Sequence, residues 1–124
     1  MSDIAVIGAG SWGTTFAKIL VDAGESVTIW ARRPELPREI SETSRNSDYL
    51  RGINLPRALM AHHDLHQAVA GARMIYLAVP SQSLRSNLEA LTPLLGHETV
   101  LVSLMKGVEA GSGLRMSQVI QEVT

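Results

Sequence analysis

The sequence predicts an α/β fold built on a doubly wound parallel sheet, and three observations carry this prediction. Short apolar runs of strand length alternate along the chain with amphipathic stretches of helical length. The first apolar run, Ile4–Ile7, breaks into glycines spaced G-x-G-x-x-G at Gly8, Gly10 and Gly13. A second strand-like run follows at the spacing of a βαβ unit. Right-handed crossovers then give the strand order 3-2-1-4-5, with room for further edge strands.

The glycines are typical of a phosphate-binding corner. Gly8 lets the chain turn sharply off the strand, Gly10 lets backbone approach a pyrophosphate, and Gly13 lets helix and strand pack closely. The next helix directs unpaired N–H groups and the positive end of its dipole toward the same place, where Ser11 can offer its hydroxyl. We therefore expect a Rossmann-like dinucleotide site, the alternative being a glycine-rich turn that binds no ligand.

The helix after the glycines is predicted to bury one apolar face. The members of that face recur at helical spacing: Trp12, Phe16, Ile19, Leu20 and Ala23. Gly24 is expected to end the helix as a left-handed cap.

A second strand, Val27–Ala31, is rich in β-branched and aromatic residues and is expected to be buried on both faces. It is followed by Arg32 and Arg33, near the position where an acidic residue would hold the ribose of NAD. A guanidinium here can pair with a 2′-phosphate, which favours NADPH over NADH and leaves dual use open. The alternative is a solvated surface pair.

The middle of the chain is more polar. A short surface helix is expected within Glu35–Ser47 and an ordered loop over Asn46–Pro56. A small third strand is expected at Leu59–Ala61, and Asp64 is expected to cap a short helix over Leu65–Ala70.

The last third of the chain repeats the alternation. Met74–Val79 is predicted to be the most clearly buried strand, stopped by Pro80, with Ser81 capping the next helix. The apolar face of that helix comprises Leu84, Leu88, Leu91 and Leu95. A fifth strand at Val100–Val102 and a helix over Leu114–Val123 complete the pattern. The ligand site should lie at the carboxyl ends of these strands.

Composition narrows the function classes. The net charge of −1, from 11 basic and 12 acidic residues, provides no field for nucleic acid, and the absence of cysteine removes disulfides and thiolate metal sites. The apolar run at the N-terminus is too short for a signal peptide or membrane span, so we expect a cytoplasmic protein without membrane insertion. His62, His63 and His66 are interpreted as surface residues, and no metal is expected.

Five motifs occur in order along nearly the whole chain. They are G-A-G-S-W-G-T at residues 8–14, W-A-R-R at 30–33, N-x-x-Y-L-x-G-I-x-L-P at 46–56, A-V-P-S-Q at 78–82 and S-L-M-K-G-V-E at 103–109. Together they resemble the N-terminal domain of bacterial NAD(P)-dependent sn-glycerol-3-phosphate dehydrogenase. The resemblance implies an oxidoreductase that transfers hydride from NAD(P)H to dihydroxyacetone phosphate, giving sn-glycerol 3-phosphate for phospholipid synthesis.

The resemblance also assigns site residues. The cofactor contacts it implies are Gly8, Gly10, Ser11, Trp12, Gly13, Arg32, Arg33, Tyr49 and Lys106. Lys106 would also touch the phosphate-bearing substrate, where a compact cation can stabilise the oxygen that becomes an alkoxide.

Two departures from the family qualify this reading. Arg51 stands where proline is usual, which makes the loop less rigid or adds a charge toward the phosphate-binding side. In the family a second, largely helical domain supplies the catalytic lysine, so residues 1–124 are interpreted as an NAD(P)-binding fragment without catalytic residues.

A homodimer is one open oligomeric state. Another two-domain reductase of hydroxy acids or ketopantoate, or a stand-alone nucleotide-binding module, remains an alternative.

Overall fold

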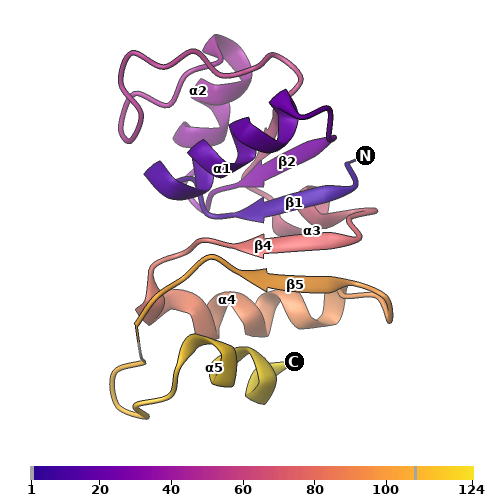
Figure 1. Cartoon of the computed structure of the whole chain (residues 1–124), viewed down its shortest axis with the longest axis vertical. Coiled ribbons are helices and arrows are strands. Elements are labelled where there is room, and N and C mark those ends of the chain that lie inside the picture. Colours follow the sequence, from indigo (N-terminus) through magenta and orange to yellow (C-terminus); the bar gives the residue numbers. More distant parts are fainter. Residues whose placement is uncertain (1, 108) are drawn as a thin grey trace.

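The computed structural model describes residues 2–107 and 109–124, so Val108 of the fifth motif lies outside the described residues. Its centre is a five-stranded parallel sheet in the predicted order β3-β2-β1-β4-β5 (Figure 1). The strands are β1 (Ile4–Ile7), β2 (Val27–Trp30), β3 (Met60–His62), β4 (Met74–Leu77) and β5 (Val100–Ser103). The described part of the chain adds no sixth strand at either edge.

Helices connect the strands at the predicted positions. They are α1 (Ser11–Asp22), α2 (Glu35–Thr43), α3 (Leu65–Val69), α4 (Leu84–Leu91) and α5 (Met116–Val123), with 3₁₀ turns at Ser81–Ser83 and Thr92–Leu94. Gly24 follows α1 with φ +94°, and the Asp64 carboxylate accepts from the Gln67 amide at 3.3 Å, which confirms both predicted helix ends. None of the described helices is long and apolar enough to cross a membrane.

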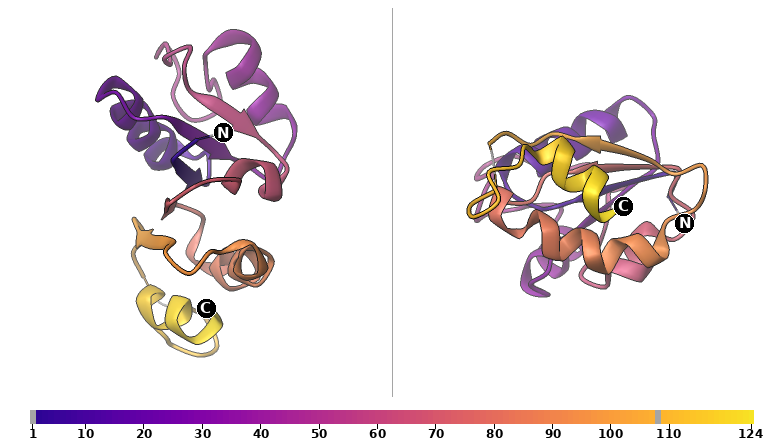
Figure 2. Two further views of the ribbon diagram at one scale, coloured as in Figure 1. Left: turned by 90° about the vertical axis from the view of Figure 1, so that its right-hand side faces the viewer. Right: turned by 90° about the horizontal axis from the view of Figure 1, so that it is seen from below.

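The sheet separates two apolar cores. Ala5, Ile7, Ile75 and Leu77 point to the face covered by α3, α4 and α5, while Ile4, Val6 and Ile29 point to the face covered by α1 and α2. Figures 1 and 2 show α1 in front of β1 and β2, with α3 and α4 behind the sheet. The alternation follows from the two-residue period of a strand, which sends neighbouring side chains to opposite faces.

The buried face of α1 differs from the predicted one. Gly13, Thr14 and Ala17 are buried against the sheet, whereas Trp12 is 54% exposed and Ile19 is 53% exposed. Small side chains permit the helix axis to approach the strands closely, so they occupy the contact. The larger residues are displaced to the side, where the Phe16 ring lies 4.9 Å from the Tyr76 ring, centroid to centroid.

The front of β4 and β5 is left uncovered within the described chain (Figure 1). Met74 and Tyr76 are half-buried there and Val100 is 51% exposed. They line a hollow of about 820 Å³ at the amino ends of the strands. The prediction that Met74–Val79 is the most clearly buried strand is therefore wrong, because its second face is only partly covered.

The predicted cap at Ser81 is also wrong. Pro80 leads into a 3₁₀ turn, and the Ser81 hydroxyl accepts from the Gln82 side-chain amide at 3.2 Å instead of from a helix amide. Leu84, Leu88 and Leu91 are fully buried as expected, but α4 ends before Leu95 because the chain tightens into a second 3₁₀ turn.

Candidate functional site: a cleft at the carboxyl ends of the strands

The three glycines of the G-x-G-x-x-G motif lie in different surroundings, which match the roles predicted for them. Gly8 has φ +119°, and a Cβ there would lie 2.4 Å from the Ala78 carbonyl oxygen. A Cβ on Gly13 would lie 2.2 Å from the Gly8 carbonyl oxygen, so α1 can pack on the strand ends only without a side chain at this position. Around Gly10, by contrast, no atom lies within 4 Å of the ideal Cβ position. That open space is what a bound pyrophosphate requires.

A cleft of about 740 Å³ lies beside this glycine corner, at the carboxyl ends of the strands. It is lined by all nine predicted contact residues: Gly8, Gly10, Ser11, Trp12, Gly13, Arg32, Arg33, Tyr49 and Lys106. Pro80 and Gln82, from the loop after β4, complete its wall. The hollow at the opposite end of the sheet contains none of these residues. Segments far apart in sequence thus converge at the place where the strand order reverses.

Ser11 and Tyr49 are linked across the corner. The Ser11 hydroxyl donates to the Tyr49 carbonyl oxygen at 3.0 Å, so in this structure it is directed at the loop. The backbone amides of Ser11, Trp12 and Gly13 begin α1 and have no helical acceptors, so they remain suited to bind an anion. Trp12 and Tyr49, which also line the cleft, are 54% and 44% exposed.

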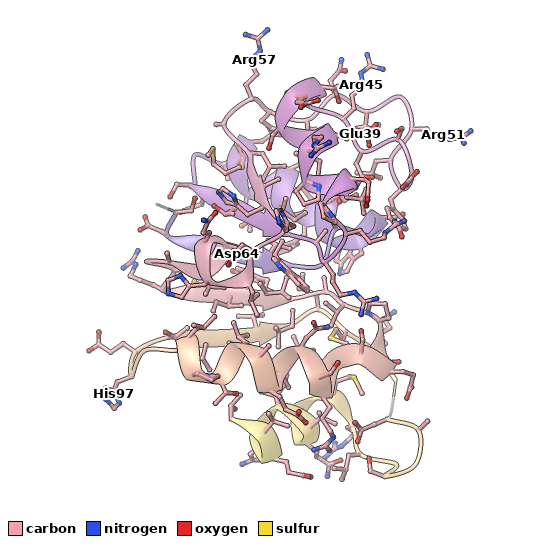
Figure 3. The ribbon with its side chains drawn as sticks, turned by 180° about the vertical axis from the view of Figure 1, so that it is seen from behind. Glu39, Arg45, Arg51, Arg57, Asp64 and His97 are labelled. Atoms are coloured by element: carbon pink, nitrogen blue, oxygen red, sulfur yellow. The ribbon has the colours of Figure 1, made fainter. Side chains whose placement is uncertain are left out.

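The two arginines after β2 differ in their partners. The Arg33 guanidinium lies 3.6 Å from an oxygen of Asp48, while Arg32 forms no ion pair among the described residues. Both are exposed, and both line the cleft. Arg51 is exposed and extends away from the body of the molecule (Figure 3), so its charge is not directed at the cleft.

The segment that carries Lys106 is anchored to α4. Arg85 donates to both carboxylate oxygens of Glu109, at 2.8 and 3.0 Å, and the Ala110 amide donates to the Gln82 side-chain oxygen at 2.8 Å. The guanidinium of Arg85, together with the Ser112 hydroxyl, holds the pKa of Glu109 below its ordinary value of 4.5.

Sequence reasoning missed two parts of this site. Asn46 is fully buried behind the glycine corner, and the Arg85–Glu109 ion pair fixes the Lys106 segment. Asn46 and Glu109 are the first and last letters of their motifs, which was the only available signal. Neither spacing nor periodicity specifies a hydrogen-bond partner.

Among the described residues, no group of three or more histidines and carboxylates gathers into a metal site.

Comparison with known proteins identifies relatives along the whole chain. A family model described as NAD-dependent glycerol-3-phosphate dehydrogenase N-terminus matches residues 3–124. A glycerol-3-phosphate dehydrogenase [NAD(P)+] from Leifsonia xyli is 64% identical over 117 residues, which cover 94% of this chain and 32% of the relative. The corresponding protein of Nocardia farcinica is 54% identical over 129 residues, covering 100% of this chain and 38% of the relative. The chain thus spans about a third of the length of these relatives.

Solved structures agree with the sequence relatives. A glycerol-3-phosphate dehydrogenase from Coxiella burnetii superposes with a TM-score of 0.90 at 30% identity, covering 98% of this chain and 37% of that one. One from Saccharomyces cerevisiae gives a TM-score of 0.87 at 30% identity, covering 98% and 39%.

Substitutions at two of the glycines are expected to separate stability from binding. Gly13→Ala places a methyl group against backbone and should lower the free energy of unfolding by about 1–3 kcal/mol or more. Gly10→Ala should cost about 1 kcal/mol, because alanine is a poorer N-cap than glycine but adopts the φ of −71° at this position without strain. It should nevertheless abolish most NADPH binding by filling the open space. Chemical denaturation and fluorescence titration measure the two effects, and the opposite ranking would refute the assigned roles.

The Arg85–Glu109 pair predicts a pH dependence. Because the folded-state pKa of Glu109 is lowered, the stabilisation it provides is present above the unfolded pKa and is lost as the pH falls through the folded value. Arg85→Ala should raise the pKa of Glu109 toward 4.5 and reduce the steepness of acid destabilisation. Carboxyl ¹³C NMR titration tests this, with Lys18→Ala, which removes an exposed ion pair elsewhere, as the control. An unchanged Glu109 titration in Arg85→Ala would contradict the assignment.

Proposed function

Because the chain belongs to the family of NAD-dependent glycerol-3-phosphate dehydrogenase N-termini, we propose that it serves as the cofactor-binding domain of a longer dehydrogenase. That enzyme interconverts dihydroxyacetone phosphate and sn-glycerol 3-phosphate, in glycerophospholipid synthesis in the cytoplasm. The observation that carries the proposal is the convergence of five sequence motifs on one cleft at the carboxyl ends of the strands.

The chain's own groups suit a dinucleotide diphosphate. The open space at Gly10 and the first amides of α1 form a concave, donor-rich corner, where backbone N–H groups bind phosphate oxygens without a bulky side chain intervening. Trp12 and Tyr49 border this corner. When bound, the nicotinamide supplies the hydride, and the role of this domain is to hold and orient it.

The arginine pair supports a preference for NADPH. A 2′-phosphate near the end of β2 would meet two guanidinium groups, of which, among the described residues, Arg32 has no competing ion pair and Arg33 has only the exposed Asp48. Exposed ion pairs of this kind contribute little, so Arg33 can exchange its partner for a phosphate at small cost.

Lys106 is the group of this domain that we assign to the substrate. It is exposed in the cleft, on a segment fixed to α4 by the Arg85–Glu109 pair. There its ammonium can stabilise negative charge on the carbonyl oxygen of the substrate as hydride arrives. Proton transfer and the catalytic lysine are assigned to a second, helical domain. The uncovered apolar front of β4 and β5 supports a further packing partner of this kind.

The cofactor preference is tested by removing both charges. Arg32→Ala/Arg33→Ala should weaken NADPH binding about 10- to 100-fold, the value of one or two charged hydrogen bonds, and change NADH binding less than about threefold. The cleft-lining Trp30 provides the fluorescence signal. Arg57→Ala removes an equal charge that points away from the body (Figure 3) and should leave both affinities unchanged. Tighter binding of NADH than of NADPH by the unsubstituted chain would overturn the preference.

The reaction is tested with the full-length product of the reading frame. It should oxidise NADPH when given dihydroxyacetone phosphate, and Lys106→Met should lower kcat/KM by about 10²- to 10³-fold. Dihydroxyacetone without its phosphate and ketopantoate are the matched comparison substrates. Turnover of ketopantoate alone would favour the alternative reductase, and cofactor binding without turnover of any of them would favour a binding module.

A further inference from the structure

Asn46 is the most deeply buried amide side chain near the cleft, although it does not line it. It is 0% exposed, and its polar atoms are satisfied inside the protein. Its side-chain nitrogen donates to the Ala9 carbonyl oxygen at 2.9 Å and to the Thr14 hydroxyl at 2.9 Å, while its side-chain oxygen accepts from the Tyr49 amide at 3.3 Å. One amide thus joins the glycine loop, helix α1 and the Tyr49 loop.

The bond to Ala9 fixes the direction of the next backbone donor. The peptide bond between Ala9 and Gly10 is planar and trans, so its carbonyl and its N–H point in opposite directions. With the Ala9 carbonyl held toward buried Asn46, the Gly10 N–H must point away from Asn46. Gly10 has open space around it and lines the cleft. The buried Asn46 side chain therefore directs the Gly10 N–H toward the glycine corner.

The same side chain fixes the loop that crosses the corner. The Asn46 carbonyl oxygen accepts from the Leu50 amide at 2.7 Å, and its side chain accepts from Tyr49, so residues 46–50 form a closed turn. That turn places the Tyr49 carbonyl on the Ser11 hydroxyl, at 3.0 Å, and Asp48 beside Arg33. Two of the residues assigned to cofactor binding are thus held by contacts that originate at Asn46.

We propose that Asn46 is the positioning residue of the cofactor site, setting the glycine corner and the Tyr49 loop in their binding geometry before a dinucleotide arrives. The inference rests on the proposed cofactor site and adds a residue that touches no ligand. Preorganised donors bind an anion without a cost of rearrangement, so loss of Asn46 lowers affinity beyond any loss of stability.

The test compares Asn46→Leu, which keeps the approximate shape and removes the amide, with two controls. Thr14→Val removes one buried partner of Asn46 but leaves the bond to Ala9. Ser47→Ala, on the same loop as Asn46, loses the hydroxyl bond to Glu39 of α2, and neither residue lines the cleft. NADPH affinity is measured by fluorescence at a temperature where circular dichroism shows each variant folded, alongside its free energy of unfolding. We expect at least a tenfold weaker affinity for Asn46→Leu and less than a twofold change for both controls.

A second measurement does not require a variant to fold. In the unsubstituted chain, NMR should show slow solvent exchange of the Asn46 side-chain amide with and without NADPH, and a shift of the Gly10 amide on binding. Asn46 protons that exchange freely in the unliganded chain, or an Asn46→Leu variant that binds like Thr14→Val, would overturn the positioning role alone. Absence of NADPH binding by the unsubstituted chain would instead overturn the proposed cofactor site, and the positioning role with it.

Discussion

The close approach of α1 to the ends of β1 and β4 is the constraint on which the site depends. At Gly13 a side chain would collide with the Gly8 carbonyl, and at Gly8 it would collide with the Ala78 carbonyl. Because both positions lack a Cβ, the helix N-terminus lies directly against the strand ends, and its unpaired amides meet the cleft. The packing that closes the core thereby also creates the anion-binding corner.

The same contact accounts for the surface of α1. A helix that approaches this closely can bury only small residues, so Thr14 and Ala17 face the sheet. The large apolar residues Trp12 and Ile19 remain exposed at its sides. Beside this helix, Met74, Tyr76 and Val100 form an apolar front that the described chain does not fully cover, which is consistent with relatives about three times as long. Trp12 is placed at the mouth of the cleft by the same displacement.

Two polar anchors then hold the outer parts of the site. Buried Asn46 ties the Tyr49 loop to the glycine corner, and the partly buried Arg85–Glu109 pair ties the Lys106 segment to α4. Asn46 and Glu109 both lie outside the regular helices and strands, and each anchor joins segments separated by more than twenty residues. The cleft therefore consists of the closely packed glycine corner and two flanking loops, and side-chain hydrogen bonds fix the positions of these loops.

By itself the sequence determined the order of strands and helices, the strand order of the sheet and the convergence of the glycine corner, Arg32, Arg33 and Lys106 at one edge, because period, glycine spacing and crossover handedness are local or topological properties. Tyr49 was assigned to the same site by the family resemblance alone. It failed where burial depends on what packs above a residue. The face of α1, the half-open β4, the absent cap at Ser81 and the direction of the Ser11 hydroxyl were decided only by tertiary structure. The hydrogen-bond partners of Asn46 and Arg85 were also decided only by tertiary structure. A hydrogen bond between distant segments depends on how those segments lie in space, and spacing along the sequence does not specify that position.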